Sequence, residues 1–338
     1  MTDRAIGETG ASGVWRSIAV AFLWVMAAML LGLIPFVAAN EFQIFMAVIV
    51  MLNVIVVVGF NIVKGYAGQV TVAQVALYAI GAYSSALLTL QLGLSFWLSL
   101  PLSILVAAAF GFVIGAPSVR LAGAYLGLAT LGLAEAVRLV LTATPAFGGA
   151  SGIFGIEAPS FFGISLEDPA RYFYLVLPIM LCGVFVSWNI SRTGIGRAFR
   201  AIREDEMSAA SSGIPVNRYK LLAFVISAAY AGCAGALFAH LQPRFISPDQ
   251  FTLPQMVLFL LMLIMGGMGR LWGVILGAIL VTVLEHVARS YYYYEYLIFG
   301  LTIVVMVAFL PQGIAGMVEN ALVVRRFRKL RESPADAA

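Results

Sequence analysis

Apolar runs of about 20 residues recur from one end of this 338-residue chain to the other. An α-helix of that length crosses the hydrocarbon core of a bilayer, which is about 30 Å thick. Charged residues make up 11% of the chain, less than half of the roughly 25% found in soluble domains. The gaps between the runs are too short to hold a soluble domain. The sequence therefore predicts an all-α fold, a polytopic transmembrane helical bundle.

We expect about ten membrane-spanning helices. They cover residues 17–39, 41–63, 69–92, 95–117, 121–143, 171–191, 218–240, 254–268, 271–289 and 295–313. Glycines and polar residues interrupt the third run, and the eighth is short. The apolar part of the first run is longer than the roughly 7 to 15 residues of a signal-peptide core. We therefore expect an uncleaved first helix.

The basic residues predict the orientation of these helices. If ten helices start from a cytoplasmic N-terminus, sixteen of the twenty Lys and Arg residues face the cytoplasm, which is the bias of the positive-inside rule. We therefore predict one membrane domain over residues 17–318, between cytoplasmic tails at 1–16 and 319–338. The net charge of +4 follows from this orientation. It does not indicate nucleic-acid binding, which needs a basic surface on a folded aqueous domain.

The same topology predicts an inverted repeat. Predicted helices 2–5 start from the outer side, whereas helices 7–10 start from the inner side, so the two groups would be related by inversion. The sequence supports this only faintly, in a similarity between residues 65–83 and 228–240.

Residues 192–220 form the longest charge-rich stretch inside the predicted membrane domain. Each charge would cost several kcal/mol in hydrocarbon, so the stretch faces solvent. Good helix formers over 196–211, followed by Gly213 and Pro215, predict a short amphipathic helix on the membrane surface. Two functions are open: a solvated loop that follows the positive-inside rule, or a docking helix for a soluble partner.

Pairs of glycines four residues apart indicate close helix packing. The pairs are Gly111 and Gly115, Gly123 and Gly127, and Gly273 and Gly277. This spacing lets helix backbones approach closely in a lipid solvent that provides no hydrophobic drive for association.

Polar residues at membrane depth single out the third run. Gly65, Gly68 and Gly81 occur there together with Gln69 and Gln74. Irregular backbone cannot face lipid, so one interpretation is a broken helix that faces protein or a water-filled path. The other is a helix packed tightly in the bundle, with its glutamines hydrogen-bonded to neighbouring helices.

The chain carries no G-x-x-x-x-G-K-[ST] phosphate loop, no H-E-x-x-H motif and no Cys/His cluster. We therefore expect no catalytic residues, no bound cofactor and no metal.

Glu135 and Arg138 lie three residues apart on one helical face, and charges inside a membrane are functional candidates. Two roles are open for Glu135: it stabilises a contact between helices, or it stabilises the outer part of a polar path. A proton-coupled transporter would need several unpaired carboxylates, which argues against ion coupling.

Four segments give the chain a resemblance to a known family. They are GYAGQVTVAQVALYAIGAYSSALL at 65–88, RLAGAYLGLATLGLAEAVRLVL at 120–141, the run from GRAFRAIREDE to GALFAH at 196–240 followed by FISPD at 245–249, and GGMGRLWGVILGA at 266–278. In their order and spacing the chain resembles the LivM-type permease subunits of branched-chain amino-acid ABC importers. The loop of small residues at 148–153 departs from the family pattern and leaves selectivity open.

The resemblance implies half of a transporter in a bacterial inner membrane. Its implied partners are a second permease subunit in a heterodimer, two ABC ATPase subunits and a periplasmic solute-binding protein. The loop 192–217 would carry the helix that couples to the ATPases, with hydrolysis performed by those partners. The residues expected at this contact are Arg197, Arg200, Arg203, Glu204, Ala209, Ala210 and Gly213.

The resemblance also implies a translocation path along the interface between the two permeases. We expect it to be lined or bordered by helices carrying 65–83, 120–138 and 226–240. The candidate residues are Gly65, Gly68, Gln69, Gln74, Tyr83, Tyr125, Glu135 and Arg138. Leucine, isoleucine and valine are the expected solutes. The alternatives are urea, an amide, another amino acid or an aromatic acid in the same importer class, an ion-coupled secondary transporter, and a membrane-embedded enzyme.

Overall fold

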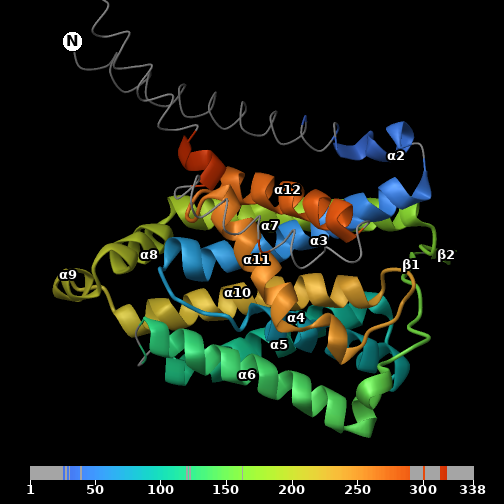
Figure 1. Cartoon of the computed structure of the whole chain (residues 1–338), viewed down its shortest axis with the longest axis horizontal. Helices are drawn as coiled ribbons and strands as arrows, with labels where there is room; N and C mark the ends of the chain where they lie inside the picture. Colours follow the sequence, from blue (N-terminus) through green and yellow to red (C-terminus); the bar gives the residue numbers. More distant parts are fainter. Residues whose placement is uncertain are drawn as a thin grey trace, which may run out of the picture.

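Long helices run roughly side by side in the computed structural model of the chain (Figure 1). The structure describes residues 26, 29, 31–38, 40–118, 121, 123–161, 163–289, 300 and 313–317. In this part of the chain, strand is confined to a two-residue antiparallel hairpin of β1 (Ser160–Phe161) and β2 (Ile164–Ser165). The predicted helical bundle is therefore confirmed for the described residues.

Most of the predicted spans correspond to helices. The main helices are α3 (Glu41–Phe60), α4 (Gln74–Leu90), α5 (Phe96–Ser118), α6 (Ala124–Ala143), α7 (Pro169–Arg192), α10 (Val216–Ala239), α11 (Leu253–Gly266) and α12 (Leu271–Arg289). Among the described residues, seven stretches are long and apolar enough to cross a membrane, and α4 is a shorter apolar helix of 17 residues.

The predicted number of ten helices is not reached within the described residues. The first predicted run is described only at residues 26, 29 and 31–38, which include the short helix α2 (Ile34–Val37). The tenth run, 295–313, lies outside the described residues except for its positions 300 and 313. Ten spans and the inverted repeat therefore stay predictions.

The bundle has two chemically distinct ends. The end that we call the α8 end contains the last residues of α3 and α7, the first residues of α10 and the turn between α11 and α12, together with α8 (Gly194–Glu204) and α9 (Glu206–Ser211). The opposite end, the hairpin end, contains β1, β2 and the turns η2 (Pro145–Phe147), η3 (Gly149–Ser151) and η4 (Pro248–Gln250). In Figure 1 these ends lie at the left and the right.

Helix α10 forms the centre of the bundle because glycines let other helices approach it closely. A Cβ atom added at Gly81 of α4 would lie 2.5 Å from Gly232 Cα, and one at Gly235 would overlap Tyr78 O. Gly111 of α5 meets Ala228 in the same way. Backbones this close gain dispersion contacts that larger residues would prevent. The two segments with faint sequence similarity, 65–83 and 228–240, therefore pack against each other.

The predicted glycine pairs do not all form helix contacts. Gly111 and Gly115 pack α5 on α10, and Gly273 and Gly277 pack α12 on α11, as expected. The third pair was predicted wrongly. Gly123 has no heavy atom within 4 Å of an added Cβ and precedes α6 with φ +55°, while Gly127 makes only an ordinary contact with Val70. Gly123 therefore serves the turn before α6, where its positive φ suits glycine.

Several buried polar side chains in the bundle form hydrogen bonds between helices. Asn53 of α3 donates to Thr282 Oγ1 of α12 at 3.0 Å. Ser85 of α4 is 3.1 Å from Ser99 Oγ of α5 and 2.9 Å from His240 Nε2. Leaving such groups unpaired would cost about 1–3 kcal/mol each. These bonds therefore fix the register of helices that apolar packing alone would leave free to slide.

Candidate functional site

Helix α8 is amphipathic. Gly196, Ala198, Phe199 and Ile202 are buried, and the helix packs on α7, α10 and the π-helical turn η1 (Asn61–Tyr66). The residues of its other face that were predicted to contact the ATPases, Arg197, Arg200, Arg203 and Glu204, are exposed. The predicted surface helix is therefore present, and most of its exposed side chains are cationic.

The predicted helix over 196–211 is not continuous. Asp205 adopts extended backbone angles, φ −157° and ψ 116°, and its carboxylate accepts a 2.8 Å hydrogen bond from Ser208 N. An aspartate in this position caps a new helix, so the segment breaks into α8 and α9. The sequence contains this signal, because Asp and Ser favour caps over helix interiors. The predicted stop at Gly213 is confirmed, since Gly213 follows α9 with φ +81°.

An ion pair joins α9 to α10. Lys220 Nζ lies 2.5 Å from Glu206 Oε1, and only 4% of the Lys220 side chain is exposed. Ala209 is buried on the inner side of α9, whereas Ala210 is exposed. A buried ammonium needs a partner to offset its desolvation. Glu206 therefore holds α9 against the bundle, a role that the sequence alone did not assign.

Arg203 reaches back to its own chain. Its guanidinium Nη1 donates to Gly65 O of η1, and Arg203 also lies against Gly68 and Gly269. Among the described residues, no hydrogen bond or ion pair joins the guanidinium of Arg197 to another side chain. The predicted arginines of α8 therefore divide into one held by the bundle and others directed to solvent.

The segment that joins α3 to α4 is irregular, as predicted. Residues 67–73 lie between η1 and α4 without forming helix, and Gly68 has φ +70°. Gln69 is buried here. Gln74 is buried at the start of α4, where it accepts from Ser227 Oγ at 2.9 Å and donates to Val56 O at 3.3 Å. Both interpretations of the sequence hold in part: the backbone is broken, and Gln74 is bonded to neighbouring helices.

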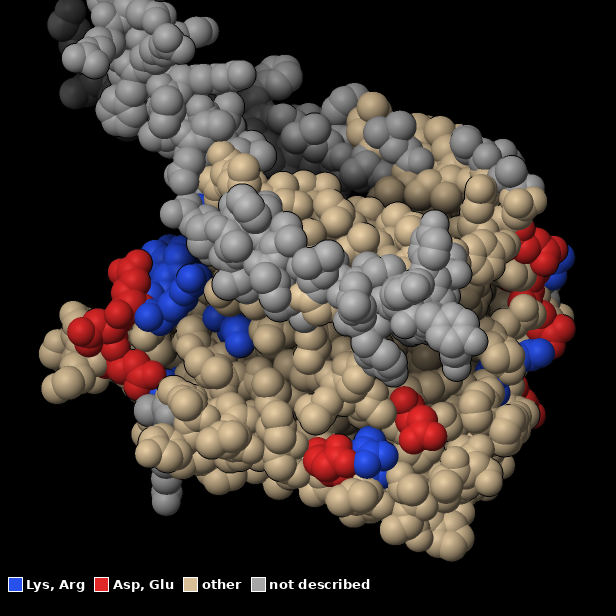
Figure 2. All heavy atoms as spheres, in the orientation of Figure 1, with Lys and Arg blue, Asp and Glu red and all other residues tan. Residues whose placement is uncertain are grey.

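Three of the remaining candidates lie near the hairpin end. Arg138 Nε donates to Glu135 Oε1 at 2.9 Å, and Arg138 Nη1 lies 4.0 Å from Asp249 Oδ1. Tyr83 is buried, and its hydroxyl has no hydrogen-bond partner among the described residues. In the lower half of Figure 2, where Figure 1 shows α6, a basic patch lies between two acidic patches on an otherwise uncharged surface. The predicted pair on α6 is therefore confirmed, and Asp249 joins it.

The predicted path residues do not form one cluster. Gly65 and Gly68 lie at the α8 end beside Arg203, and Gln69 follows Gly68 in the chain. Glu135 and Arg138 lie beside Asp249 of η4. Tyr125 is 75% exposed near the start of α6. The sequence analysis did not single out Asn61 and Gly269, although a polar residue near the end of an apolar run and the G-G-M-G sequence at 266–269 were visible signals. The structure joins them, because Gly269 N donates to Asn61 Oδ1 at 2.8 Å.

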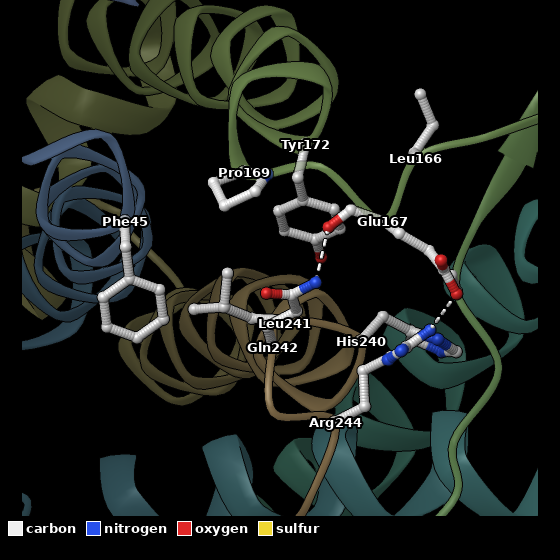
Figure 3. Close-up of a pocket in the computed structure, with 10 residues that line it drawn as sticks. Phe45, Leu166, Glu167, Pro169, Tyr172, His240, Leu241, Gln242 and Arg244 are labelled. Carbon is white, nitrogen blue, oxygen red and sulfur yellow. Dashed lines mark hydrogen bonds and ion pairs between the residues drawn. The ribbon is translucent and has the colours of Figure 1, made fainter. Parts of the chain in front are cut away.

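A small hollow opens at the hairpin end (Figure 3). It is lined by Phe45, Ala158, Leu166, Glu167, Pro169, Tyr172, His240, Leu241, Gln242 and Arg244. It has room for about one water molecule, so it is too small for an amino acid. Arg244 Nη1 donates to Glu167 Oε1 at 2.8 Å, and Gln242 donates to Glu167 O. These bonds tie the end of α10 to the loop before α7.

His240 beside this hollow is buried and neutral. Burial, together with the nearby charge of Arg244, lowers its pKa to about 4, although the hydrogen bond with Glu157 O acts in the opposite direction. Its Nδ1 is 2.8 Å from Glu157 O, and its Nε2 bonds to Ser85. Both ring nitrogens are used in structure, so His240 joins the end of α10 to α4 and to the loop at the hairpin end that contains Glu157.

Comparisons with known proteins place the chain in a family of transport permeases. A family model described as the branched-chain amino acid transport system permease component matches residues 42–307. The LivM permease protein of the high-affinity branched-chain amino acid transport system of Escherichia coli K12 is 39% identical over 300 residues, which cover 82% of this chain and 70% of that protein.

Two further relatives show the range of the likeness. The LivM protein of Salmonella typhimurium is 37% identical over 325 residues, 89% of this chain and 76% of that protein. The LsrC permease protein of the autoinducer 2 import system of Klebsiella pneumoniae is 34% identical over 167 residues, 47% of this chain and 46% of that protein. No solved structure matches the chain. The chain belongs to the permease component family of branched-chain amino acid transport systems.

Proposed function

We propose that this chain is a permease subunit of an ATP-binding-cassette importer that carries branched-chain aliphatic amino acids into a bacterial cell. It forms half of the translocation path beside a second permease subunit. Two separate ATPase subunits supply the energy, and a periplasmic binding protein delivers the solute. The single structural observation that supports this function best is the cationic face of α8, which the bundle leaves exposed at one end.

The α8 end is the cytoplasmic end in this proposal. Lys64, Arg192, Arg218 and Arg270 lie at helix ends there, together with the arginines of α8. A cytoplasmic excess of Lys and Arg is the usual orientation signal of membrane proteins. In Figure 2 most charged side chains gather at the two ends of the bundle, and the surface between them is largely uncharged apart from the patches over α6. The bundle axis therefore lies across the membrane.

The ATPases dock on the exposed face of α8 and α9. Arg197, Arg200 and Glu204 of α8, with Ala210 of α9 and Gly213 after it, provide the contact surface. Charge complementarity of this kind guides partner choice and orientation. When ATP brings the two ATPases together, each docked α8 moves with its ATPase and changes the packing of the attached helices. The pump thus alternates between two states that nucleotide and solute stabilise to different extents.

The translocation path borders α6 in this proposal. Glu135 and Arg138 are partly exposed within a predicted span, with 38% and 25% of their side chains accessible. Charges at membrane depth are costly against lipid and belong beside protein or water. Tyr125, on the exposed side of the same helix, and the buried Tyr83 of α4 border the same path. The second permease subunit covers this side of α6.

The docking assignment is tested with the double variant Arg197→Gln and Arg200→Gln. In proteoliposomes that contain the full importer, we expect solute-stimulated ATP hydrolysis to fall on the order of tenfold, because charged contacts at an interface contribute most when they are desolvated. Arg171→Gln at the hairpin end is the matched control, since Arg171 bonds only to Ser165 O of its own chain in the described structure. Normal stimulation in the double variant would refute the docking role.

The transported solute has a second candidate class, because a relative named for autoinducer 2 import aligns with nearly half of this chain. The binding protein and the permeases together set the selectivity of such importers. Uptake of labelled leucine by the reconstituted importer, with valine, isoleucine, urea and autoinducer 2 as competitors, distinguishes the classes. Competition by valine and isoleucine alone supports branched-chain transport, whereas competition by autoinducer 2 alone overturns it.

A further inference from the structure

Three glycines from two distant parts of the chain surround the Arg203 side chain. Gly65 and Gly68 belong to the segment after α3, and Gly269 lies in the turn between α11 and α12. A Cβ atom at Gly68 would lie 2.9 Å from Arg203 Cγ, and one at Gly269 would lie 2.5 Å from Arg203 Nη1. A Cβ atom at Gly65 would lie 2.7 Å from Gly269 N. We call this arrangement the Arg203 socket.

The socket holds the arginine by both shape and charge. Arg203 Nη1 donates to Gly65 O, and Asn61 Oδ1 binds the adjoining turn through Gly269 N. Hydrogen bonds with a charged partner are about twice as strong as neutral ones. Gly68 and Gly269 have φ angles of +70° and +84°, which L side chains rarely adopt. Both the space and the backbone geometry of the socket therefore depend on glycine.

The socket is connected onward to α6. Beyond Gly68, the side chain of Val70 lies 3.5 Å from the position of a Cβ on Gly127, and Val72 N donates to Thr130 Oγ1 at 3.0 Å. Gly127 and Thr130 are both residues of α6. A continuous series of contacts thus runs from α8 through the segment 65–72 to α6.

We propose that Arg203 is a positioning residue that transmits the motion of α8 to α6, and that it does not dock the ATPases. The inference rests on the proposed function, since it requires that ATPases dock on α8. Arg203 moves with α8 and pulls the segment 65–72 through Gly65 O and Gly68. Because that segment is bonded to α6, the helix that carries Glu135 and Arg138 changes position with it. Energetic coupling between distant sites is carried by contiguous packed and hydrogen-bonded elements of this kind.

The proposal separates two arginines of one helix by their function. Arg197 faces solvent and contacts the ATPase, whereas Arg203 bonds to the bundle. Loss of the first should prevent docking. Loss of the second should leave docking intact and uncouple ATP hydrolysis from transport. A merely structural role for Arg203 would lower both activities together, so the ratio of solute transported to ATP hydrolysed is the diagnostic quantity.

The experiment compares Arg203→Gln with Arg197→Gln in the full importer, reconstituted in proteoliposomes with its binding protein. We expect Arg203→Gln to co-purify with the ATPases and hydrolyse ATP, while the leucine transported per ATP falls on the order of tenfold, as loss of a charged hydrogen bond allows. Arg203→Lys keeps a cationic donor for Gly65 O and should restore part of the ratio. Arg197→Gln should instead lose ATPase subunits on purification.

A second variant tests the socket without removing the arginine. Gly68→Ala adds a methyl group against Arg203 Cγ and should lower the same ratio. Gly93→Ala is the matched control, because Gly93 also has a positive φ, +60°, but no heavy atom within 4 Å of an added Cβ. The comparison of Gly68→Ala with Gly93→Ala tests the transmission role of Arg203 even where Arg203→Gln yields no stable complex.

The outcomes are distinguishable. A normal ratio in Arg203→Gln or in Gly68→Ala overturns the transmission role. Loss of the ATPases from Arg203→Gln, to the same degree as from Arg197→Gln, overturns it too and leaves the docking proposal standing. Unchanged assembly, hydrolysis and transport in both arginine variants overturns the docking proposal itself.

Discussion

Helices α10 and α6 both have the length and composition of membrane spans, yet they differ in surroundings. In the most apolar part of each, 56% of α10 is buried against the rest of the chain, compared with 22% of α6. Backbones of α4 and α5 meet α10 at glycines, whereas Leu128 and Tyr125 of α6 are 67% and 75% exposed. The chain itself therefore supplies the environment of α10, while lipid, a partner subunit or a water-filled path supplies that of α6.

This difference indicates where stability and function reside. Changes in α10 act on packing within the chain, where backbone contacts leave no room for adjustment. Changes in α6 act on whatever covers this helix in the assembled importer. A substitution on α10 should therefore show its effect in the purified subunit, and one on α6 should show it mainly in transport.

The largest expected effect is that of Gly81→Ala at the contact between α4 and α10. The new Cβ would lie 2.5 Å from Gly232 Cα, and neither backbone can rotate away as a side chain can. We expect a loss of about 3 kcal/mol in the free energy of unfolding, at the upper end for overpacking. Denaturant titration of the purified protein in detergent measures it.

The matched control for this substitution lies on α6. Gly132 has no heavy atom within 4 Å of an added Cβ, so Gly132→Ala should change stability by less than about 0.5 kcal/mol. Equal losses in the two variants would contradict the contrast between the helices.

A smaller effect is expected when acid acts on His240, at the hairpin end of α10. The pKa of His240 is about 4 in the folded protein because the ring is buried, against about 6.5 in an unfolded chain. Between these values only the unfolded state takes up the proton, so stability is full above about pH 6.5 and falls as the pH is lowered. The loss should reach about 2 kcal/mol at pH 5.

Thermal unfolding of the purified protein at pH 7 and pH 5 measures this dependence. His240→Gln has no imidazole to titrate and should be less stable at pH 7 but flatter with pH. A variant that keeps the full pH dependence would show that other groups cause it.

The smallest effect on stability is expected from the ion pair of α6. Glu135 and Arg138 are partly exposed, and exposed pairs contribute about 0.2–1 kcal/mol. A double-mutant cycle with Glu135→Gln and Arg138→Gln in detergent should therefore give a coupling of about 0.5 kcal/mol. The same variants should lower uptake by the assembled importer clearly. A coupling above about 2 kcal/mol would mean that the pair belongs to the packed part of the bundle.

Much of the fold was predictable from the sequence. The apolar runs located α3, α5, α7, α10 and α12 to within a few residues. A membrane-spanning helix needs about 20 consecutive apolar residues, and the loops of this chain contain no run of that length. Glycines and glutamines also indicated the irregular segment between α3 and α4. The predicted helix contact at Gly123 and Gly127 was wrong, because the spacing of two glycines does not reveal whether another helix of the chain faces them.

The candidate site was predictable only in outline. Charge placed the α8 segment at the surface, and residue types suggested its capping glycine. The break at Asp205 has a local cause, the cap bond with Ser208 N. The ion pair of Glu206 with Lys220 depends on how the segment folds back on α10. The socket for Arg203 depends on residues from three separate parts of the sequence. No local pattern specifies such a contact.

By itself, the sequence indicated that the chain belongs in a membrane, which segments are long and apolar enough to cross it, and which stretch is too highly charged to lie in hydrocarbon. These properties follow from transfer free energies that each segment carries alone. Only the tertiary structure decided which helices are enclosed by the chain, which face remains for partners, and which arginine of α8 is bound by its own bundle. Those properties depend on backbones meeting at glycines such as Gly68 and Gly232, and a distance between two remote backbones exists only once the chain has folded.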